Sequence, residues 1–461
     1  MLGISEPKLR AAVDAAAPGA APSSGGVERV GVVTWLTAAV FALAALLSYT
    51  DRYVLNLLLE PLRRDLALDD TQVSVLIGAA FAVMYALVSL PLGRLADRVN
   101  RRNLIAFGIL IWSAGTVVCG LSPSFATLFA GRLIVALGEA SLAPAVFSIM
   151  ADLFPPRLRG RALGLFLTAT GLGNAASLII GGALMGMAER GALGGLPWIG
   201  ALAPWRITLV LVGLPGVIVA LLVRSLAEPP RLGRTHAGAP PLRDFIKLLF
   251  ERRGRLATMY AGLAMFAVAD LSFTIWRPTL FVRQFGFSSQ AVGLALGAVA
   301  LMAAVAGSFG GGWFGDWLVE RGGTAARIRY FLLTTCIMIP AALLTGVHSP
   351  WIAMAAIAVS AIAGAMVSGA IMTSLQEQLP NEYRGLGSSL SAFVGILLGV
   401  GAGPTLVALC TEHIYRNPHL VGLGMATVAA PSLLIAVCAF RHTLRNSESP
   451  GAAAPIKAVR G

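Results

Sequence analysis

Six ionisable side chains lie deep within long apolar stretches of this chain, where they could bind an anion or carry a proton. They form three pairs along the sequence, which are Asp51 with Arg52, Arg132 with Glu139, and Asp270 with Arg277. A charged side chain at the centre of a lipid-embedded helix costs about 2.5–3.5 kcal/mol on insertion scales. Six unpaired charges would cost on the order of 15–20 kcal/mol, which exceeds the stability of a typical fold. We therefore expect these side chains to face one another or a wet cavity.

The spacing within each pair argues against a direct bond along one helix. Two of the pairs have members seven residues apart, which places them on one helix face about 10 Å apart along the axis. Close contact along a helix needs a spacing of three or four residues. The adjacent Asp51 and Arg52 point about 100° apart. Their partners are therefore expected on other helices or in a bound molecule.

The composition indicates that the apolar stretches cross a membrane. Of the 461 residues, 57% are hydrophobic and 12% are charged, and the mean hydropathy is +0.78. A soluble domain carries about 25% charged residues. The four cysteines lie in apolar stretches without CxxC spacing, and the five histidines lie in expected loops or helix ends. The pattern predicts an all-α polytopic membrane protein with no metal site, no cofactor and no disulfide framework.

Twelve stretches are long and apolar enough to span a bilayer, which takes about 20 residues per helix. Their expected ranges are 32–59, 70–93, 103–121, 124–150, 162–187, 205–224, 254–283, 288–314, 328–347, 350–376, 385–411 and 420–440. A polar connection separates the sixth stretch from the seventh. It ends in LRDFIKLLFERR, Leu242–Arg253, which is either an interfacial helix or a solvated linker.

The distribution of Lys and Arg gives the expected orientation. Most of the 35 lie in loops and tails on the side of the N-terminus, and cytoplasmic loops carry an excess of these residues. We therefore expect a protein of the inner (plasma) membrane with both termini in the cytoplasm. This placement absorbs most of the net charge of +13, so nucleic-acid binding loses its support. Residues 1–30 and 442–461 are expected to be cytoplasmic tails, the first of them disordered.

Two sequence landmarks recur in the second half of the chain. GRLADRVNRRN, after the second stretch, matches GGWFGDWLVERGG, after the eighth, and aligns Asp97 with Asp316 at an offset of 219. FPPRLRGRALG, after the fourth, matches LPNEYRGLGSS, after the tenth, and aligns Arg159 with Arg384 at an offset of 225. This agreement predicts two duplicated six-helix halves. The predicted parts are the halves 31–226 and 254–441 and a cytoplasmic inter-half loop over 227–253.

The first landmark resembles the signature loop of the major facilitator superfamily, G-x-L-a-D-r-x-x-r-r. The resemblance implies twelve helices in two pseudo-symmetric halves and a gate motif at the cytoplasmic face. Asp97 is expected to pair with nearby arginines or with a helix N-terminus such as the one near Gly385, so that the cluster latches the halves together. The alternative is that these arginines only enforce topology. The expected gate residues are Gly93, Asp97, Arg98, Arg101, Arg102, Asp152 and Asp316.

In that superfamily the first, fourth and seventh spans line the central cavity, and the six buried charges fall on those three stretches. Their expected depth separates an outer-half cluster of three arginines and one aspartate from two midplane carboxylates, Glu139 and Asp270. Arg52 or Arg132 would then be available to an anionic head group. The alternative is a fixed ion-pair network that holds the N-terminal half together.

Residues 48–165 resemble the spinster-like transporters more closely than the superfamily at large. The resemblance rests on TDRYVLNLLLEPLRRDL, LPLGRLADRVNRRNLI and GRLIVALGEASLAPAVFSIMADLFPP. That family has an Asp-Arg pair late in the first span and an Arg and a Glu seven apart in the fourth, here Asp51, Arg52, Arg132 and Glu139. Its members are associated with lysophospholipids and sphingosine phosphate, and bacterial members with protons. The resemblance implies alternating access with a titrating Glu139. The high Ala, Gly and Arg content suggests a bacterial source, where sphingosine phosphate is an unexpected substrate.

The sequence therefore predicts a proton-coupled secondary transporter of an amphiphilic or anionic small molecule such as a lysolipid. It contains no GxxxxGK[ST] phosphate loop, which disfavours ATP-driven transport by this chain. A proton-coupled exporter of drugs or of aromatic and organic acids is the alternative within the superfamily. A membrane-bound enzyme or a non-transporting sensor is a remote alternative. We expect a monomer that is not an enzyme.

Overall fold

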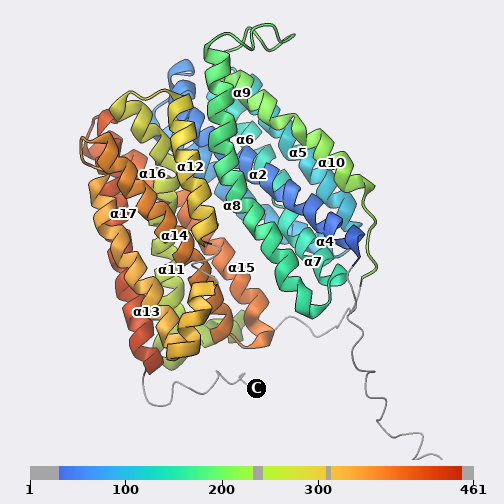
Figure 1. Ribbon diagram of the computed structural model, residues 1–461, viewed down its shortest axis with the longest axis vertical. Helices are drawn as coiled ribbons and strands as arrows, with labels where there is room; N and C mark the ends of the chain where they lie inside the picture. Colours follow the sequence, from blue (N-terminus) through green and yellow to red (C-terminus); the bar gives the residue numbers. More distant parts are fainter. Residues whose placement is uncertain (1–30, 232–241, 308–312, 449–461) are drawn as a thin grey trace, which may run out of the picture.

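The computed structural model describes residues 31–231, 242–307 and 313–448 of the chain. Throughout these ranges the regular secondary structure is helical, and it forms two bundles that lie side by side (Figure 1). The N-terminal bundle comprises α2 (Val32–Asp65), α3 (Asp70–Ser74), η1 (Val75–Ala79), α4 (Ala80–Ala96), α5 (Arg101–Leu121), α6 (Phe125–Glu139), α7 (Leu142–Leu153), α8 (Pro156–Glu189), α9 (Pro204–Gly213) and α10 (Pro215–Ser225). The C-terminal bundle comprises α11 (Leu242–Phe285), α12 (Ser289–Gly307), α13 (Gly315–Leu344), α14 (Pro350–Gln378), η3 (Asn381–Tyr383), α15 (Arg384–Val394), η4 (Gly395–Ala402), α16 (Gly403–Leu409), η5 (Cys410–Ile414), η6 (Pro418–Leu420) and α17 (Val421–Glu448).

Twelve helical segments of the described chain are long and apolar enough to cross a membrane, as the sequence predicts. Some of them combine several elements: α3, η1 and α4 form one span over Asp70–Ala96, and α6 and α7 form one over Phe125–Leu153. The predicted all-α, twelve-span fold class is confirmed. An even number of spans places the start of α2 and the end of α17 on one face, which we call the terminal face. The other end of the molecule is the opposite face.

Several elements extend beyond their predicted limits. α8 begins at Pro156 and not at 162, because a proline at the first helical position lacks only an N–H that would have no partner. α17 continues to Glu448, past the predicted end of the second half at 441. The tail predicted to be disordered, residues 1–30, lies outside the described residues.

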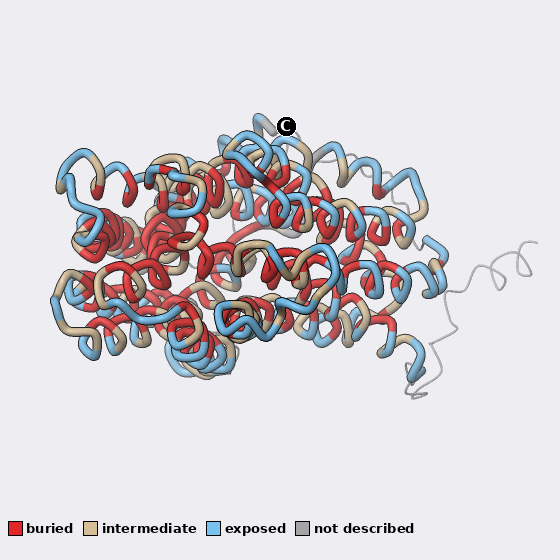
Figure 2. Tube along the Cα trace, turned by 90° about the horizontal axis from the view of Figure 1, so that it is seen from above, coloured by how far each residue is buried: buried red, intermediate tan, exposed pale blue. Residues whose placement is uncertain are grey.

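The exposed surface of the bundles is apolar, as lipid contact requires. Buried residues concentrate inside and exposed ones at the periphery (Figure 2). The exposed ones include large apolar side chains within the spans, such as Leu87, Leu167, Leu221 and Leu333. In water such an apolar surface would promote aggregation, whereas in a bilayer it contacts the lipid acyl chains.

The two bundles touch through glycines that admit close backbone approach. A Cβ at Gly293 of α12 would collide with the Leu178 carbonyl oxygen of α8 and lie 2.8 Å from the Gly182 Cα. A Cβ at Gly78 would lie 2.5 Å from the Val400 carbonyl oxygen, where the π-helical turns η1 and η4 meet. Small residues at such crossings are typical of membrane helix packing. Main-chain contacts between α8 and α12, and between η1 and η4, therefore set how closely the two bundles approach.

The predicted inter-half loop is partly helical. Residues 242–253, which the sequence left open between an interfacial helix and a solvated linker, form the first turns of α11. Gly254 has φ +69° and separates these turns from the seventh span, which begins at that residue.

Candidate functional site

The centre of the N-terminal bundle holds an ion pair between two helices. Arg52 of α2 donates from Nε to Oε2 of Glu139 at the end of α6, over 2.7 Å, and its Nη2 donates to the same oxygen. The Glu139 side chain is fully buried and that of Arg52 is 12% exposed. The sequence predicted that these charges have partners on other helices. Arg52 and Glu139, on α2 and α6, are each other's partner.

Three aromatic rings surround the Arg52 guanidinium. Its carbon lies 4.7 Å from the ring centroid of Tyr49, 4.5 Å from that of Phe81 and 5.6 Å from that of Tyr85. A cation against aromatic faces gains about 0.5–2 kcal/mol per contact, more when desolvated. The three rings therefore shield Arg52 and help to hold it beside Glu139.

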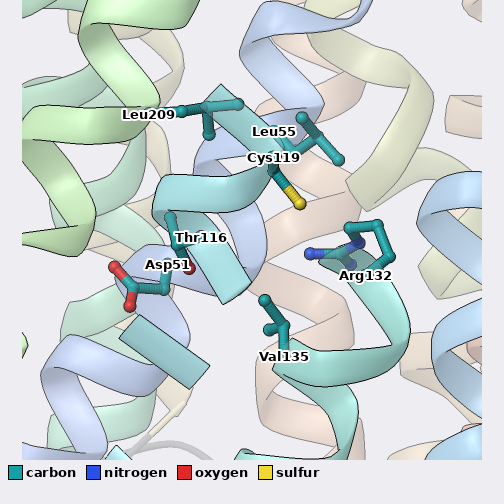
Figure 3. A pocket seen from close by; sticks show the side chains of 7 residues that line it. All are labelled: Asp51, Leu55, Thr116, Cys119, Arg132, Val135 and Leu209. Carbon is teal, nitrogen blue, oxygen red and sulfur yellow. The ribbon is translucent and has the colours of Figure 1, made fainter. Parts of the chain in front are cut away.

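Asp51 and Arg132 line a small internal cavity, which has room for about one water molecule. Figure 3 shows both side chains at its wall, with Thr116 and Cys119 of α5 between them. Neither Asp51 oxygen makes a hydrogen bond of normal geometry to a described residue, although Trp112 and Thr116 lie beside the carboxylate. Arg132 donates from Nε to the Leu76 carbonyl oxygen over 3.2 Å. Two opposite charges thus share a buried cavity without a direct bond.

The third predicted pair, Asp270 and Arg277 on α11, stays apart, as its spacing predicts. No ion pair joins the two within the described part of the chain. Asp270 packs against α14, where a Cβ at Gly364 would lie 2.5 Å from its Oδ1. Arg277 is only 4% exposed, and its Nε has no hydrogen-bond partner there.

Sequence reasoning missed a second charged cluster, which joins the two bundles. Arg283 of α11 donates to Glu60 of α2 over 2.8 Å and to Asp70 of α3 over 2.7 Å, and all three side chains are at most 3% exposed. Glu412 of η5 accepts hydrogen bonds from the Asp70 amide and from Thr71, at the N-terminus of α3. We call Glu60, Asp70, Arg283 and Glu412 the gate cluster.

The gate cluster escaped notice because its members lie at span ends, where charges are ordinary. Glu60 also bonds Arg63 and Arg64 of its own helix over 3.1 and 2.9 Å, so the sequence offered it local partners and gave no signal that it meets Arg283. These bonds join the two bundles at the opposite face.

Most of the predicted gate motif lies at the terminal face of the N-terminal bundle, where it bonds residues of that bundle and of the segment that follows α10. Arg101 bonds Asp152, and it bonds Glu228 of the inter-half segment over 2.9 Å. The Glu228 carboxylate also accepts from the Arg102 amide over 2.9 Å. Asp97 accepts a bond from Arg231 through its main-chain carbonyl.

The remaining motif residues are less constrained. Arg98 is exposed, and a side chain at Gly93 would meet nothing within 4 Å. These bonds involve the N-terminal half and the segment that leaves it. The latch between the two halves remains a prediction.

The duplication is visible in the C-terminal bundle as a matching cluster. Arg327 bonds Asp316 over 2.6 Å and also bonds Glu377. Glu377 lies at the end of α14 as Asp152 lies at the end of the fourth span, and Asp316 is the counterpart of Asp97, which supports the duplication inferred from the two landmarks.

The described ranges contain no group of three or more His, Cys, Asp or Glu that could hold a metal ion, and the four cysteines are free.

Comparison with known proteins identifies the family. A profile of the Major Facilitator Superfamily matches residues 41–404. An MFS-type efflux pump of Mycolicibacterium smegmatis is 28% identical over 88% of this chain and 91% of its own length. Protein spinster of Drosophila melanogaster is 25% identical over 88% of this chain and 68% of its own length.

A solved structure agrees in fold. It is a bacterial homolog of the human lysosomal transporter Spinster, inward-facing and unoccupied, with TM-score 0.75 and 25% identity over 93% of this chain and 100% of that chain. The matched proteins are transporters and not enzymes. The chain belongs to the Major Facilitator Superfamily and is a spinster-like, twelve-span membrane transporter.

Proposed function

We propose that this protein is a proton-coupled secondary transporter that carries an anionic amphiphile, such as a lysolipid, by alternating access. The observation that carries the proposal is the Arg52–Glu139 pair, buried between helices and ringed by aromatic side chains. An anionic head group and the Glu139 carboxylate would compete for the same guanidinium.

That competition supplies a mechanism for coupling. When an anion binds the Arg52 guanidinium, the Glu139 carboxylate loses its partner. A buried carboxylate without a counter-charge is strongly unfavourable. Proton binding to Glu139 relieves it, so substrate and proton enter together. When the proton leaves, Glu139 recaptures Arg52 and expels the anion. Asp51 and Arg132, which share the adjacent cavity, offer a second place for a proton.

Arg277 extends the anion site across the interface between the bundles. Its Nε has no hydrogen-bond partner within the described residues, and the side chain is buried. Such a group calls for an acceptor, which the substrate would supply. Tyr49, Phe81 and Tyr85 would then contact the apolar part of the molecule.

In the proposed orientation the protein lies in the inner (plasma) membrane, and its terminal face is on the cytoplasmic side. The excess of Lys and Arg in the loops of that face supports this. With the opposite face closed by the gate cluster, the structure then faces inward. The proposed working unit is a monomer, since a single chain supplies all the residues of the proposed site.

Proton flux in proteoliposomes tests the proposal. Addition of lysophospholipid should evoke proton movement with the wild type and none with Glu139→Gln. Glu189→Gln, which changes an exposed glutamate at the end of α8, is the matched control and should behave as wild type. Flux that survives in Glu139→Gln would move the coupling to Asp51 or Asp270.

Export of drugs or organic acids is the second candidate, favoured by the likeness to an MFS-type efflux pump. Wild-type protein that ignores lysophospholipid but exchanges protons with an aromatic cation or an organic acid would select it. The fold and the charged site would stand in either case.

A further inference from the structure

The turns of α11 that precede Gly254 lie outside the membrane span. α11 begins at Leu242, whereas the seventh span begins at Gly254. Gly254 has φ +69°, a left-handed conformation that glycine adopts readily and other residues do not. It redirects the chain between two helical stretches. We call residues 242–253 the junction helix.

One face of the junction helix is fixed to the C-terminal bundle. Phe245 and Leu248 are buried in a cluster with Leu256, Leu379 and Tyr383. The rings of Phe245 and Tyr383 stack with their centroids 6.0 Å apart. Leu379 and Tyr383 belong to the connection between α14 and α15, which lies at the terminal face. The helix is therefore held at that face and is not a free linker.

The other face is exposed and has a mixed chemistry. Arg243, Ile246, Lys247 and Phe250 are all exposed, and their spacing of three and four residues puts them on one side of the helix. Ile246 is 47% exposed and Phe250 68%. Lys247 Nζ lies 3.5 Å from Oδ1 of Asp244, and the two side chains are 53% and 29% exposed. Two large apolar groups thus alternate with two bases along one surface.

We propose that this exposed face binds anionic lipid head groups in the bilayer leaflet next to the terminal face. An amphipathic helix with bases beside apolar residues is the form that lies in a membrane interface. Ile246 and Phe250 would enter the boundary between head groups and acyl chains, while Arg243 and Lys247 reach the phosphates. The position supports this occupant, because the helix adjoins the point where the chain enters the membrane. The inference is independent of the transported molecule.

Nitroxide accessibility tests the proposal on the full chain, with the four native cysteines replaced by alanine. Labels are placed by Ile246→Cys and Phe250→Cys, and by Glu382→Cys as a control in water at the same face, where Glu382 is exposed. The protein is reconstituted in vesicles of phosphatidylcholine with or without phosphatidylglycerol. With phosphatidylglycerol, the ratio of oxygen to nickel-chelate accessibility should be several-fold higher at 246 and 250 than at 382.

The charge requirement is tested by Arg243→Gln with Lys247→Gln, which should lower that ratio toward the value in phosphatidylcholine alone. Arg441→Gln removes an exposed base from the end of α17 and should leave the ratio unchanged. Nickel-chelate access at 250 equal to that at 382 would show a water-solvated face and overturn the proposal. Low access to both probes would indicate a protein contact, such as a second copy, and overturn it too. An equal ratio in both lipids would refute the preference for anionic head groups.

Discussion

At the scale of single residues, Arg52 and Glu139 are tied together by burial. Each is the other's counter-charge in a part of the protein that water does not reach freely. Removing one partner of such a pair typically costs about 3–5 kcal/mol, whereas replacing both by neutral groups of similar volume costs far less. Single and double variants of the pair should therefore affect the stability of the protein differently from its transport activity.

We expect Arg52→Met and Glu139→Gln each to lower the melting temperature of the purified protein clearly. The double variant should lie closer to wild type than the sum of the two losses, because it leaves no unpaired buried charge. Thermal unfolding in detergent measures this. Additive losses in the double variant would mean that the two groups do not interact energetically. Transport should be absent in all three.

The sequence predicted which charged residues of the N-terminal bundle are buried, but not how they pair. Isolated charges in apolar stretches identify Asp51, Arg52, Arg132 and Glu139, because lipid makes each of them expensive. Whether Arg52 meets Glu139 or a substrate depends on the rotation of α2 against α6, which periodicity does not fix. The gate cluster was missed for a different reason, since a charge at the end of a span carries no penalty that would mark it.

At the scale of elements, glycines decide how closely the bundles approach. Gly293 on α12 faces main-chain atoms of α8, which cannot yield as a flexible side chain would. We expect Gly293→Ala to force the two helices apart and to destabilise the closed opposite face. Gly164→Ala, at a site on α8 where a Cβ meets nothing within 4 Å, is the control.

Cysteine-labelling rates at the opposite face measure that separation. The rate at an introduced Trp351→Cys, a position 79% exposed in the structure, serves as the reference for a surface that stays open. A buried position at that face outside the gate cluster, Leu68→Cys, 7% exposed in the structure, should label faster when combined with Gly293→Ala and not with Gly164→Ala. Equal rates in both backgrounds would mean that the helices absorb the added methyl group.

The segment that leaves the N-terminal bundle caps two helix ends at once. Glu228 accepts from the amides of Arg101 and Arg102 at the start of α5. Arg231 donates to the carbonyl oxygen of Ala96, the last residue of α4, over 2.8 Å, and to that of Val99, just beyond the helix, over 2.6 Å. A carboxylate at a helix N-terminus and a guanidinium at a C-terminus each complement the local dipole.

We therefore expect Glu228→Ala to expose the first amides of α5. Loss of a capping carboxylate costs about 1 kcal/mol, so hydrogen exchange at Arg101 and Arg102 should rise about fivefold. Hydrogen-exchange mass spectrometry on peptides covering 96–105 measures it. Glu382→Ala, an exposed acid at the same face of the C-terminal bundle, should leave these peptides unchanged. Unchanged exchange in Glu228→Ala would mean that water replaces the carboxylate without loss.

At the scale of the whole molecule, the number of spans and the duplication followed from the sequence, whereas the conformation did not. The twelve apolar stretches and the two repeated landmarks can be read directly from the residue types and their order in the chain. The choice between open and closed faces rests on a free-energy difference of a few kcal/mol between two packings of the same helices. The pairing of Arg283 with Glu60 and Asp70 contributes to that difference, and only the folded structure shows it.

Breaking the gate cluster should therefore change which face is open. Glu60→Gln with Asp70→Asn leaves Arg283 buried without a counter-charge in the closed state, a loss of about 3–5 kcal/mol that opening relieves by hydration. Because this is comparable with the gap between the two states, the population should move toward the form with an open opposite face. Spin labels at Ala201 and Trp351, on the two bundles at that face, should move apart. Labels at Gly160 and Gly385, where a side chain meets nothing within 4 Å, should approach each other at the terminal face. Pulsed electron–electron distance measurements on both pairs report the two movements, and a change at one face alone would argue for local opening and against alternating access.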